Sequence, residues 1–413
     1  MRTLFNMARV AVIVSNPCTM DARVIKMARA ARDGGHEVHV FATLGNDALP
    51  YEKVNKITFN RLEWRPSQII IEHSPLRFLP KFMRGLSVFI AKKLTPFVKY
   101  RLFSGLFASH VAGVKPDIIH AHDLICLQAA IDAAEICGAK VVYDAHELEV
   151  HRNPPLPFLQ KRRVAQVEHK FGRMAFAVIT VGRKVGEVLG AHLGRSDINI
   201  LYNSPIMEPC SRDIRGELGL GPDKPLVIYV GKVTMGRGVA EILGLLPKLK
   251  GVTFATVGPV DDANRNDLNQ LATRLGVANR FRILPAVPFE QVVDYISGAD
   301  AGVISVEPVT LSYLYCMPNK LFEMSFADVP IISNKLDEIE EFLAENANGK
   351  IVDFEDQAAL VYTIFRIFNE KDSYRFDAAR RARLETAYSW QAQAAKLITI
   401  YDRALAAGHG KAK

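Results

Sequence analysis

Residues 226–246 read LVIYVGKVTMGRGVAEILGLL, and this stretch decides the fold. A run of apolar and aromatic residues is followed by a glycine-rich turn and then by apolar residues at helical spacing. A strand without a polar face is typical of a parallel sheet that helices cover on both sides. The stretch therefore predicts a strand, a turn and a helix, which is the repeating unit of doubly wound α/β domains.

The same alternation extends outward from this stretch along most of the chain. The strands expected before it are RVAVIVSN, EVHVFATL, ITFNRLEW, DIIHAHD, KVVYDAHE and AFAVITVG, and those after it are VTFATVG, FRILPA, AGVISV, VPIISN and GKIVDF. Turn-forming residues between the two series indicate a domain boundary. We expect two Rossmann-like doubly wound α/β domains, arranged as an N-terminal domain over 1–203, a linker over 204–224, a C-terminal domain over 225–388 and a last helix over 389–413 that crosses back to the N-terminal domain.

Composition restricts the class of protein. Of the 413 residues, 49% are hydrophobic and 23% are charged, as in globular proteins and unlike disordered or collagenous chains. The five cysteines lie far apart and form no Cys-x-x-Cys pair, which favours a cytoplasmic protein over a disulfide framework or a zinc site. No apolar run reaches the roughly 18 residues that span a bilayer. Arg9 interrupts the first apolar stretch, so we expect a strand there and not a signal peptide.

The glycine turn of the opening stretch resembles a P-loop but lacks its last two residues. Gly231 and Gly236 are followed by Arg237 and Gly238, where a P-loop has Lys and Ser or Thr, so the hydroxyl that binds magnesium is missing. The turn still suits a diphosphate, because glycines expose backbone N–H groups and Lys232 and Arg237 add positive charge. A tight strand-to-helix turn with two solvated cations is the alternative.

A second candidate lies in MPNKLFEMSFADVPIIS, where Pro318 begins a helix that carries Glu323. A carboxylate at this place can accept hydrogen bonds from the two hydroxyls of a ribose. The backbone N–H groups expected to face a phosphate are those of the first helical turn: Asn319, Lys320 and Leu321. The alternative is that Glu323 is an ordinary exposed helical glutamate.

Histidines gather at the ends of two expected strands. In DIIHAHD, His120 and His122 share one face of the strand and Asp123 takes the other. The spacing of the pair suggests a metal, but no third ligand at suitable spacing is evident, which favours a single histidine contacting a sugar hydroxyl or a developing charge. His146 and Glu147 end the next strand and are expected in the same crevice. In the alternative interpretation, one of the four side chains of His120, His122, His146 and Glu147 only caps a helix or fills the core.

Several motifs are absent from the sequence, and their absence narrows the chemistry. No Gly-x-Gly-x-x-Gly follows a strand, which disfavours a nicotinamide or flavin dehydrogenase. The sequence also has no Gly-x-Ser-x-Gly, no His-Glu-x-x-His and no Asp-x-Asp pair, so hydrolases, zinc proteases and metal-clamped nucleotide-sugar sites lack their usual residues. We expect neither a metal nor a cofactor.

In combination these segments resemble the GT-B fold retaining glycosyltransferases of family 4 (glycosyl transferases group 1), which build bacterial envelope polysaccharides and glycolipids. The matching segments run in the expected order over nearly the whole chain: the stretch from Asp21 and Arg23 to GGHEVHV, DIIHAHD, VYDAHE, VGKVTMGRG, the run from ILPAVPF to DAGVIS, and MPNKLFEMSFADVPIIS. The resemblance implies two domains that face each other across a cleft. A UDP- or GDP-sugar would bind mainly to the C-terminal domain, and the acceptor would bind to the N-terminal domain.

The resemblance also implies roles for single residues. Lys232 and Arg237 would hold the diphosphate, the backbone at Val287 would contact the nucleobase, Glu323 would bind the ribose, and His122 would lie at the donor sugar. His122 and Glu323 are thus the candidates for catalysis, and transfer would retain the anomeric configuration with the leaving diphosphate stabilised by cations instead of a metal. Candidates on the acceptor side are Asp21, Arg23, His146 and Glu147.

One position departs from the family pattern. The family's usual pair of glutamates, separated by seven residues, would place the first glutamate at position 315, which is a tyrosine in this chain. Only the second, Glu323, is present. The contacts that the first glutamate normally makes to the donor sugar are therefore in question at Tyr315.

Positive charge is concentrated in one segment. The chain carries 52 basic and 44 acidic residues, and no acidic residue occurs between Glu72 and Asp117. A helix over 80–94, ended by Pro96, would align five apolar residues on one side (Phe82, Met83, Leu86, Phe89 and Ile90) and three cations opposite them (Lys81, Arg84 and Lys92). Such a helix suits an anionic membrane surface, so we expect residues 77–107 to bind one. In the alternative, the apolar side packs on the domain and the cations are solvated.

These observations favour a transferase that acts on a lipid-linked or saccharide acceptor at the inner face of the cytoplasmic membrane. No nucleic-acid recognition module accompanies the basic segment, so a nucleic-acid partner is not expected. Two other functions remain open. One is a nucleotide-sugar epimerase of the same fold, which needs no acceptor. The other is a non-catalytic scaffold at the membrane, which the tyrosine at position 315 suggests because it replaces the family's first glutamate.

Overall fold

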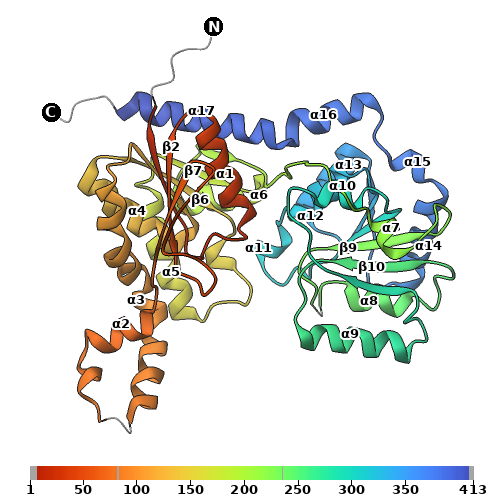
Figure 1. The fold of residues 1–413 in the computed structure, drawn as a ribbon, viewed down its shortest axis with the longest axis horizontal. Coiled ribbons are helices and arrows are strands. Elements are labelled where there is room, and N and C mark those ends of the chain that lie inside the picture. The colour runs from red at the N-terminus through yellow and green to blue at the C-terminus, as the bar shows by residue number, and fades with distance from the viewer. Residues whose placement is uncertain (1–6, 81–82, 235, 409–413) are drawn as a thin grey trace. The chain divides into compact units, whose positions relative to one another are not determined.

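The computed structural model describes residues 7–80, 83–234 and 236–408, and the chain forms two compact units (Figure 1). Unit 1 comprises the residues up to Leu201 together with those from Ala394 onward, and unit 2 comprises Tyr202–Gln393. The stretch 204–224, expected as a linker, is part of unit 2 and contains helix α7 (Ile214–Leu218). Its Ile214 is buried in the core of that unit, which explains why this stretch packs with unit 2.

Unit 1 is built on a sheet whose strands follow the order β3-β4-β2-β1-β5-β6-β7-β8. All neighbouring strands pair in parallel except β3 and β4, which form a hairpin through Asn55 and Lys56, both with positive φ. The strands are β1 (Arg9–Ile13), β2 (Glu37–Thr43), β3 (Tyr51–Val54), β4 (Ile57–Leu62), β5 (Ile118–His122), β6 (Lys140–Ala145), β7 (Ala177–Thr180) and β8 (Ile198–Ile200). Strands β3 and β8 were not predicted from the sequence, and both are short edge strands.

Helices cover both faces of this sheet. They are α1 (Ala22–Asp33), α2 (Pro66–Glu72), η1 (Pro75–Phe78), α3 (Arg84–Gly113), α4 (Asp123–Cys137), η3 (Glu149–His151), α5 (Phe158–Gly172), α6 (Arg183–Leu193) and most of α17 (Trp390–Gly408). Helix α1 begins at Asp21, whose side chain accepts a hydrogen bond from the backbone N–H of Val24. That cap fixes the turn between β1 and α1, where the candidate residues of the first strand lie.

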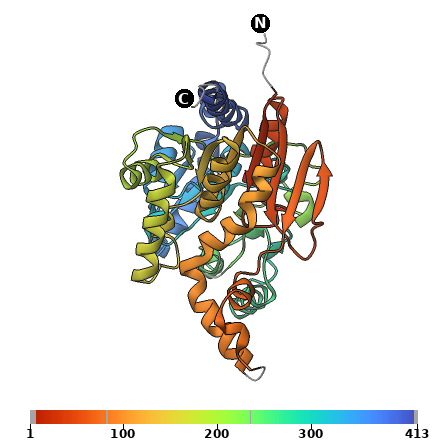
Figure 2. The same cartoon turned by 90° about the vertical axis from the view of Figure 1, so that its left-hand side faces the viewer.

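The α2–α3 hairpin (residues 66–99) extends from the sheet of unit 1 (Figures 1 and 2). The prediction that Pro96 ends the helix was wrong, because α3 continues through it to Gly113. Tyr100, Phe103 and Phe107 in the second half are buried, and this packing outweighs the roughly 3 kcal/mol that a proline costs inside a helix. The hydroxyl of Thr95 donates to the carbonyl of Ala91 at 2.8 Å in the turn before the proline.

Unit 2 contains a fully parallel sheet with the strand order β11-β10-β9-β12-β13-β14. Its strands are β9 (Leu226–Val230), β10 (Thr253–Val257), β11 (Phe281–Leu284), β12 (Ala301–Ile304), β13 (Ile331–Ser333) and β14 (Gly349–Ile351). Its helices are α7, α8 (Val239–Leu245), α9 (Asp262–Arg274), α10 (Val292–Ile296), α11 (Leu311–Leu314), α12 (Asn319–Phe326), α13 (Asp337–Asn346), α14 (Gln357–Asn369), α15 (Lys371–Tyr374) and α16 (Ala378–Tyr388). The order reverses beside β9, and ligands of such sheets bind near this switch point.

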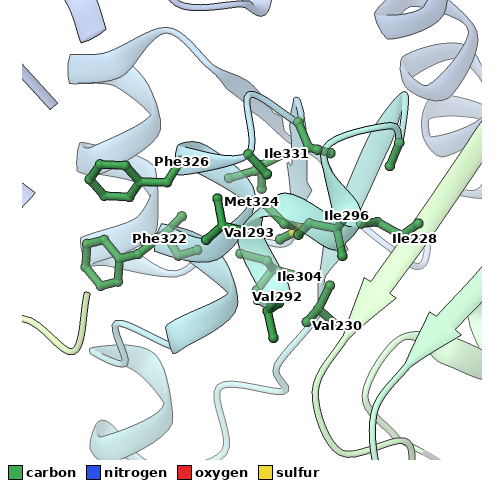
Figure 3. Close-up of a cluster of buried hydrophobic side chains, with 14 of the residues drawn as sticks. Ile228, Val230, Val292, Val293, Ile296, Ile304, Phe322, Met324, Phe326 and Ile331 are labelled. Carbon is green, nitrogen blue, oxygen red and sulfur yellow. The ribbon is translucent and has the colours of Figure 1, made fainter. Parts of the chain in front are cut away.

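A hydrophobic cluster fixes α12 against the sheet of unit 2 (Figure 3). Phe322 and Met324 of α12 pack with Val292 and Ile296 of α10. A Cβ atom at Gly302 of β12 would lie 2.0 Å from the sulfur of Met324, so a larger residue there would force the Met324 side chain to move. The packing determines where the polar residues of α12 project.

No helix among the described residues is both long enough and apolar enough to cross a membrane.

Candidate functional site

Unit 2 contains a cavity of about 290 Å³ beyond the carboxyl ends of β9, β10 and β11 and beside the start of α12. Six of the nine donor-side residues predicted from the sequence line it: Gly231, Arg237, Val287, Asn319, Lys320 and Glu323. The structure therefore brings together the glycine turn and the start of α12, about 90 residues apart in sequence, because the carboxyl ends of parallel strands share one edge of the sheet.

The floor of this cavity is made of backbone. Gly231 has φ 112° and its N–H donates to the carbonyl of Val257 at 2.9 Å. A Cβ atom at Gly258 would lie 2.1 Å from the carbonyl oxygen of Gly231, so glycine is required where the ends of β9 and β10 meet. Without side chains at these two positions, a ligand can approach the backbone closely.

Lys320 places an amine beside this floor. The residue is 8% exposed, and its Nζ lies 3.6 Å from the centroid of the Tyr229 ring. Burial, together with the positive charge of Arg237, lowers the pKa of Lys320 to about 7. Glu323, half-buried one turn further along α12, opposes this shift. The cavity thus has a cationic side that is poorly neutralised, as an anionic ligand requires.

Three of the predicted donor-side residues do not line the cavity. Lys232 is exposed, and its carbonyl accepts a hydrogen bond from the hydroxyl of Tyr229 at 3.0 Å. Gly238 is buried as the residue before α8, where a Cβ would lie 2.4 Å from that of Ser305. Leu321 was wrongly expected to offer its N–H to a phosphate, because that N–H donates to the carbonyl of Pro318 and its side chain is in the core.

Tyr315, at the position of the missing glutamate, follows helix α11 (Leu311–Leu314). Its N–H donates to the carbonyl of Leu311 at 3.0 Å, which closes the short helix. The residue is half-buried and is not among those that line the cavity. Position 315 therefore supplies a phenol where the family pattern has a carboxylate.

Unit 1 contains a second cluster, in which histidines and carboxylates lie at the carboxyl ends of β5 and β6. The rings of His120 and His122 stack with centroids 4.3 Å apart, which confirms that both lie on one face of the strand. His122 Nδ1 lies 3.2 Å from Asp144 Oδ2 and 3.1 Å from His146 Nε2. His146 Nδ1 in turn lies 3.2 Å from the carboxylate of Asp123. Of the side chains expected in one crevice, the three histidines therefore gather around Asp144, and Glu147 does not.

Asp144 is ionised although it is completely buried. Burial opposes its charge, but the guanidinium of Arg23 donates to both carboxylate oxygens, at 2.8 and 2.7 Å, and holds the pKa of Asp144 well below its usual range. Burial likewise opposes the charge of His146, yet the carboxylates of Asp123 and Asp144 raise the pKa of His146 to about 9. Burial lowers the pKa of His122, which is therefore neutral at pH 7. Its Nε2 finds no hydrogen-bond partner in the described part of the chain.

Three residues of this cluster, His120, His122 and Asp144, could each offer one ligand atom to a metal ion. Asp144 is the third ligand that the sequence analysis did not find. The set does not fit a divalent cation, because both oxygens of Asp144 already accept hydrogen bonds from Arg23. The guanidinium and the protonated His146 would also repel a second positive charge.

The remaining candidates on the acceptor side have structural roles or lie apart. Asp21 caps α1 and also accepts a hydrogen bond from the side chain of Asn16 at 2.8 Å. Arg23 is buried in its ion pair with Asp144, so the expectation that it contacts an acceptor was wrong. Glu147 is exposed beyond the end of β6.

Sequence analysis missed two residues that organise these clusters. The hydroxyl of Tyr401 in α17 lies 2.7 Å from His120 Nδ1, and Tyr229 supports the amine of Lys320. From the sequence, a tyrosine inside a strand or helix is interpreted as a core residue. No pattern in the neighbouring residues could therefore have indicated either contact.

Comparisons with known proteins agree with this architecture. The family model described as Glycosyltransferase Family 4 matches residues 20–204, and that of Glycosyl transferases group 1 matches residues 224–370. The chain is 23% identical over 389 residues to an uncharacterized glycosyltransferase of Methanocaldococcus jannaschii, covering 90% of each chain. It is also 23% identical over 313 residues to a D-inositol 3-phosphate glycosyltransferase of Thermobispora bispora, covering 71% of this chain and 72% of that relative.

Solved structures show the same fold at low sequence identity. Sucrose-phosphate synthase from Thermosynechococcus elongatus superposes with a TM-score of 0.73 at 18% identity, over 97% of this chain and 100% of the other. Anabaena HepE in complex with UDP and glucose gives a TM-score of 0.68 at 14% identity, over 96% and 100%. Because the two family models together match most of the sequence, the chain belongs to the family 4 (group 1) glycosyltransferases and has their GT-B fold.

Proposed function

We propose that this glycosyltransferase moves a sugar from a UDP- or GDP-sugar to an acceptor with retention of the anomeric configuration. The observation that carries the proposal is the cavity of unit 2, which combines exposed backbone at Gly231 with Arg237, Lys320 and Glu323. This combination suits a nucleotide diphosphate: cations and the backbone N–H groups of Asn319 and Lys320 at the start of α12 for the phosphates, with the side-chain-free turn at Gly231 leaving room for them, and a carboxylate for the ribose. The UDP complex of Anabaena HepE, a protein of the same fold, supports the assignment.

In this proposal the cavity also assists departure of the leaving group. Charge develops on the diphosphate as its bond to the sugar breaks, and groups that are already positioned stabilise it without reorganisation. Arg237 and Lys320 would supply the positive charge in place of a metal, and the backbone at Val287 would contact the nucleobase. Front-face attack by the acceptor, on the side from which the diphosphate leaves, would account for retention.

His122 would contact the transferred sugar. Among the described residues of the cluster, the Nε2 atoms of His122 and His120 both lack a hydrogen-bond partner, whereas His146 and Asp144 are held by neighbours. His122 is the last residue of β5, so its Nε2 is the one we assign to a sugar hydroxyl. The proposed catalytic residues are therefore His122 in unit 1 and Glu323 in unit 2. The acceptor would bind to unit 1.

We also propose that the acceptor is lipid-linked and lies at an anionic membrane surface. The enzyme would then act in bacterial envelope polysaccharide or glycolipid synthesis, at the inner face of the cytoplasmic membrane. In the α2–α3 hairpin, Phe78 is 74% and Phe89 58% exposed, although aromatic side chains of this size usually lie in cores. Arg84, Lys92 and Lys93 are exposed beside them, and no carboxylate lies between residues 73 and 116. Lys81 and Phe82 of the predicted apolar helix lie outside the described residues.

The packing of the hairpin favours the membrane over the alternative in which its apolar side packs on the domain. The buried residues of the first half of α3 are Ser87 and Ala91, whereas Leu86 and Phe89 are exposed. Exposed aromatic residues beside cations are typical of helices that lie on anionic lipid, where each cation contributes about 1 kcal/mol.

The donor assignment is tested by thermal-shift and calorimetric titration of the full chain with UDP- and GDP-sugars. We expect at least one of them to raise the melting temperature, because a ligand that binds only the folded state stabilises it. Arg237→Ala and Glu323→Ala should abolish the shift, whereas Arg274→Ala, which removes an exposed arginine from α9, should not. Product analysis separates the candidate functions: epimer formation without an acceptor would indicate the epimerase, and no turnover with any acceptor would indicate the scaffold.

Binding to anionic liposomes tests the membrane assignment. Replacement of Arg84, Lys92 and Lys93 by alanine should weaken sedimentation with phosphatidylglycerol vesicles by at least tenfold. The matched control replaces three exposed cations of unit 2: Lys224, Lys250 and Arg274. Equal loss in both triple variants would show that only net charge matters, and the assignment to the hairpin would be wrong.

A further inference from the structure

The sequence predicts a binding role only for the backbone N–H of Lys320, but its side chain also lies in the cavity. A Cβ atom at Gly231 would lie 3.6 Å from Lys320 Cε and 3.8 Å from Nζ, so the amine lies directly against the glycine turn. The lysine enters from α12 and passes over the Tyr229 ring, which supports it from the strand side. The amine and the open backbone of Gly231 therefore border the same part of the cavity.

We propose that Lys320 is a proton-coupled donor-binding group: at mildly alkaline pH its buried amine is largely neutral in the free enzyme, and it takes up a proton from solvent when a nucleotide diphosphate enters the cavity. This inference rests on the proposed function, because it requires that the cavity binds a diphosphate. It adds a group that gains its charge only when the anion arrives, beside Arg237, which is charged throughout.

The surroundings of Lys320 favour the neutral amine while the cavity is empty. Burial makes the largest contribution, and the guanidinium of Arg237, from the turn before α8, adds repulsion; together they bring the pKa to about 7. Two groups act in the opposite direction, Glu323 on α12 itself and the thiol of Cys316 before it. The thiol is uncharged at neutral pH, since burial raises the pKa of Cys316 to about 12. The face of the Tyr229 ring, whose centroid lies 3.6 Å from Nζ, also favours the ammonium form, and burial raises the pKa of the Tyr229 hydroxyl.

A bound diphosphate would reverse this balance. Negative phosphate oxygens near Nζ favour the ammonium form, since an opposite charge within a few ångströms stabilises the charged state of a lysine. The acid form of the buffer gives up the proton, so its bond to hydrogen breaks as an N–H bond forms on Nζ, and nothing is oxidised or reduced. Near pH 8 the free amine is mostly unprotonated, so binding should take up close to one proton. At pH 6 the amine is already protonated, and uptake should approach zero.

Isothermal titration calorimetry of the full chain with UDP and with GDP tests this coupling. Titrations at pH 8 in buffers of different ionisation enthalpy give the number of protons exchanged, and at this pH the terminal phosphate, with a pKa of about 6, is already deprotonated. We expect uptake of 0.7–1 proton at about pH 8 and a roughly tenfold loss of affinity for each pH unit above 7.

Two variants assign the proton to its residue. Lys320→Met, which keeps a side chain of similar length, should bind with an uptake near zero and with an affinity that no longer depends on pH between 7 and 9. Lys250→Met removes an exposed lysine of unit 2 that lies outside the cavity, and it should keep the uptake of the unmodified chain. Melting temperatures of both variants establish that they fold.

The outcomes distinguish this inference from the proposed function. Binding of UDP or GDP without proton uptake, or uptake that persists in Lys320→Met, would overturn the inference and leave the donor assignment intact. Binding of neither nucleotide to the unmodified chain would overturn both. Uptake that is lost in Lys320→Met and kept in Lys250→Met would establish the coupling.

Discussion

The two units treat buried charge in opposite ways. In unit 1 the buried carboxylate of Asp144 receives two hydrogen bonds from Arg23 and a third contact from His146, so the cluster is neutralised within the protein. In unit 2 the amine of Lys320 lies against an aromatic ring and beside the guanidinium of Arg237, which disfavours its charge. The first arrangement holds the side chains of a site in place. The second leaves positive charge that a bound anion would neutralise.

The largest expected effect compares loss of a buried cation from each unit. Arg23→Ala should lower the free energy of unfolding of unit 1 by about 3–5 kcal/mol, because it leaves the buried charge of Asp144 uncompensated. Lys320→Met should leave unit 2 unchanged or stabilise it, because it removes a poorly solvated amine. Hydrogen exchange of the amides in β6 and in β9 reads the two units separately. A loss below 1 kcal/mol in β6 would contradict the comparison.

The pH dependence of stability should have opposite signs in the two units. His146 has a folded pKa of about 9 against about 6.5 when unfolded, so its contribution is complete below pH 6.5 and is lost as the pH rises through 9. Burial raises the pKa of Glu168 to about 8, and ionisation of this carboxyl adds to the decline of unit 1. Lys320 has a folded pKa of about 7 against about 10.4 when unfolded, so unit 2 gains stability from pH 7 upward.

Hydrogen exchange between pH 7 and 9, corrected for the intrinsic rate, measures these trends. We expect changes of about 2–3 kcal/mol in each unit, downward in unit 1 and upward in unit 2. His146→Gln should reduce the decline and leave the part due to Glu168, and Lys320→Met should flatten the rise. A common sign in both units would refute the comparison.

The smallest expected effect concerns a single hydroxyl. Tyr401→Phe removes the partner of His120 Nδ1 and leaves a buried ring nitrogen unsatisfied, at a cost of about 1–2 kcal/mol. Tyr362→Phe, on the exposed side of α14, is the matched control and should change nothing measurable. Equal melting temperatures of the two variants would mean that the hydrogen bond from Tyr401 contributes no net stability.

The fold could be predicted from the sequence because its strands are apolar on both faces and end in glycine or polar turns. β3 escaped this reasoning, since its residues Tyr51–Val54 are mostly exposed and carry no buried face. The helix expected to end at Pro96 extends to Gly113, because packing of the second half of α3 could not be inferred from a local rule.

The candidate site, like the fold, could be predicted from the sequence only in part. The glycine turn and the start of α12 could be brought together from strand order alone. The ion pair of Arg23 with Asp144 joins residues 121 positions apart, and neither its existence nor the burial of Lys320 follows from a local pattern. Side-chain charge states depend on such distant neighbours, which is why the roles of Arg23 and Leu321 were misassigned.

Helix α17 gives unit 1 a discontinuous sequence, since residues from Ala394 onward belong to it. The hydroxyl that forms a hydrogen bond with Nδ1 of His120 belongs to Tyr401, which is 281 positions later in the chain. During translation, all of unit 2 is therefore made before that bond can form, so a nascent chain must carry an incomplete first unit while the second one is already able to fold.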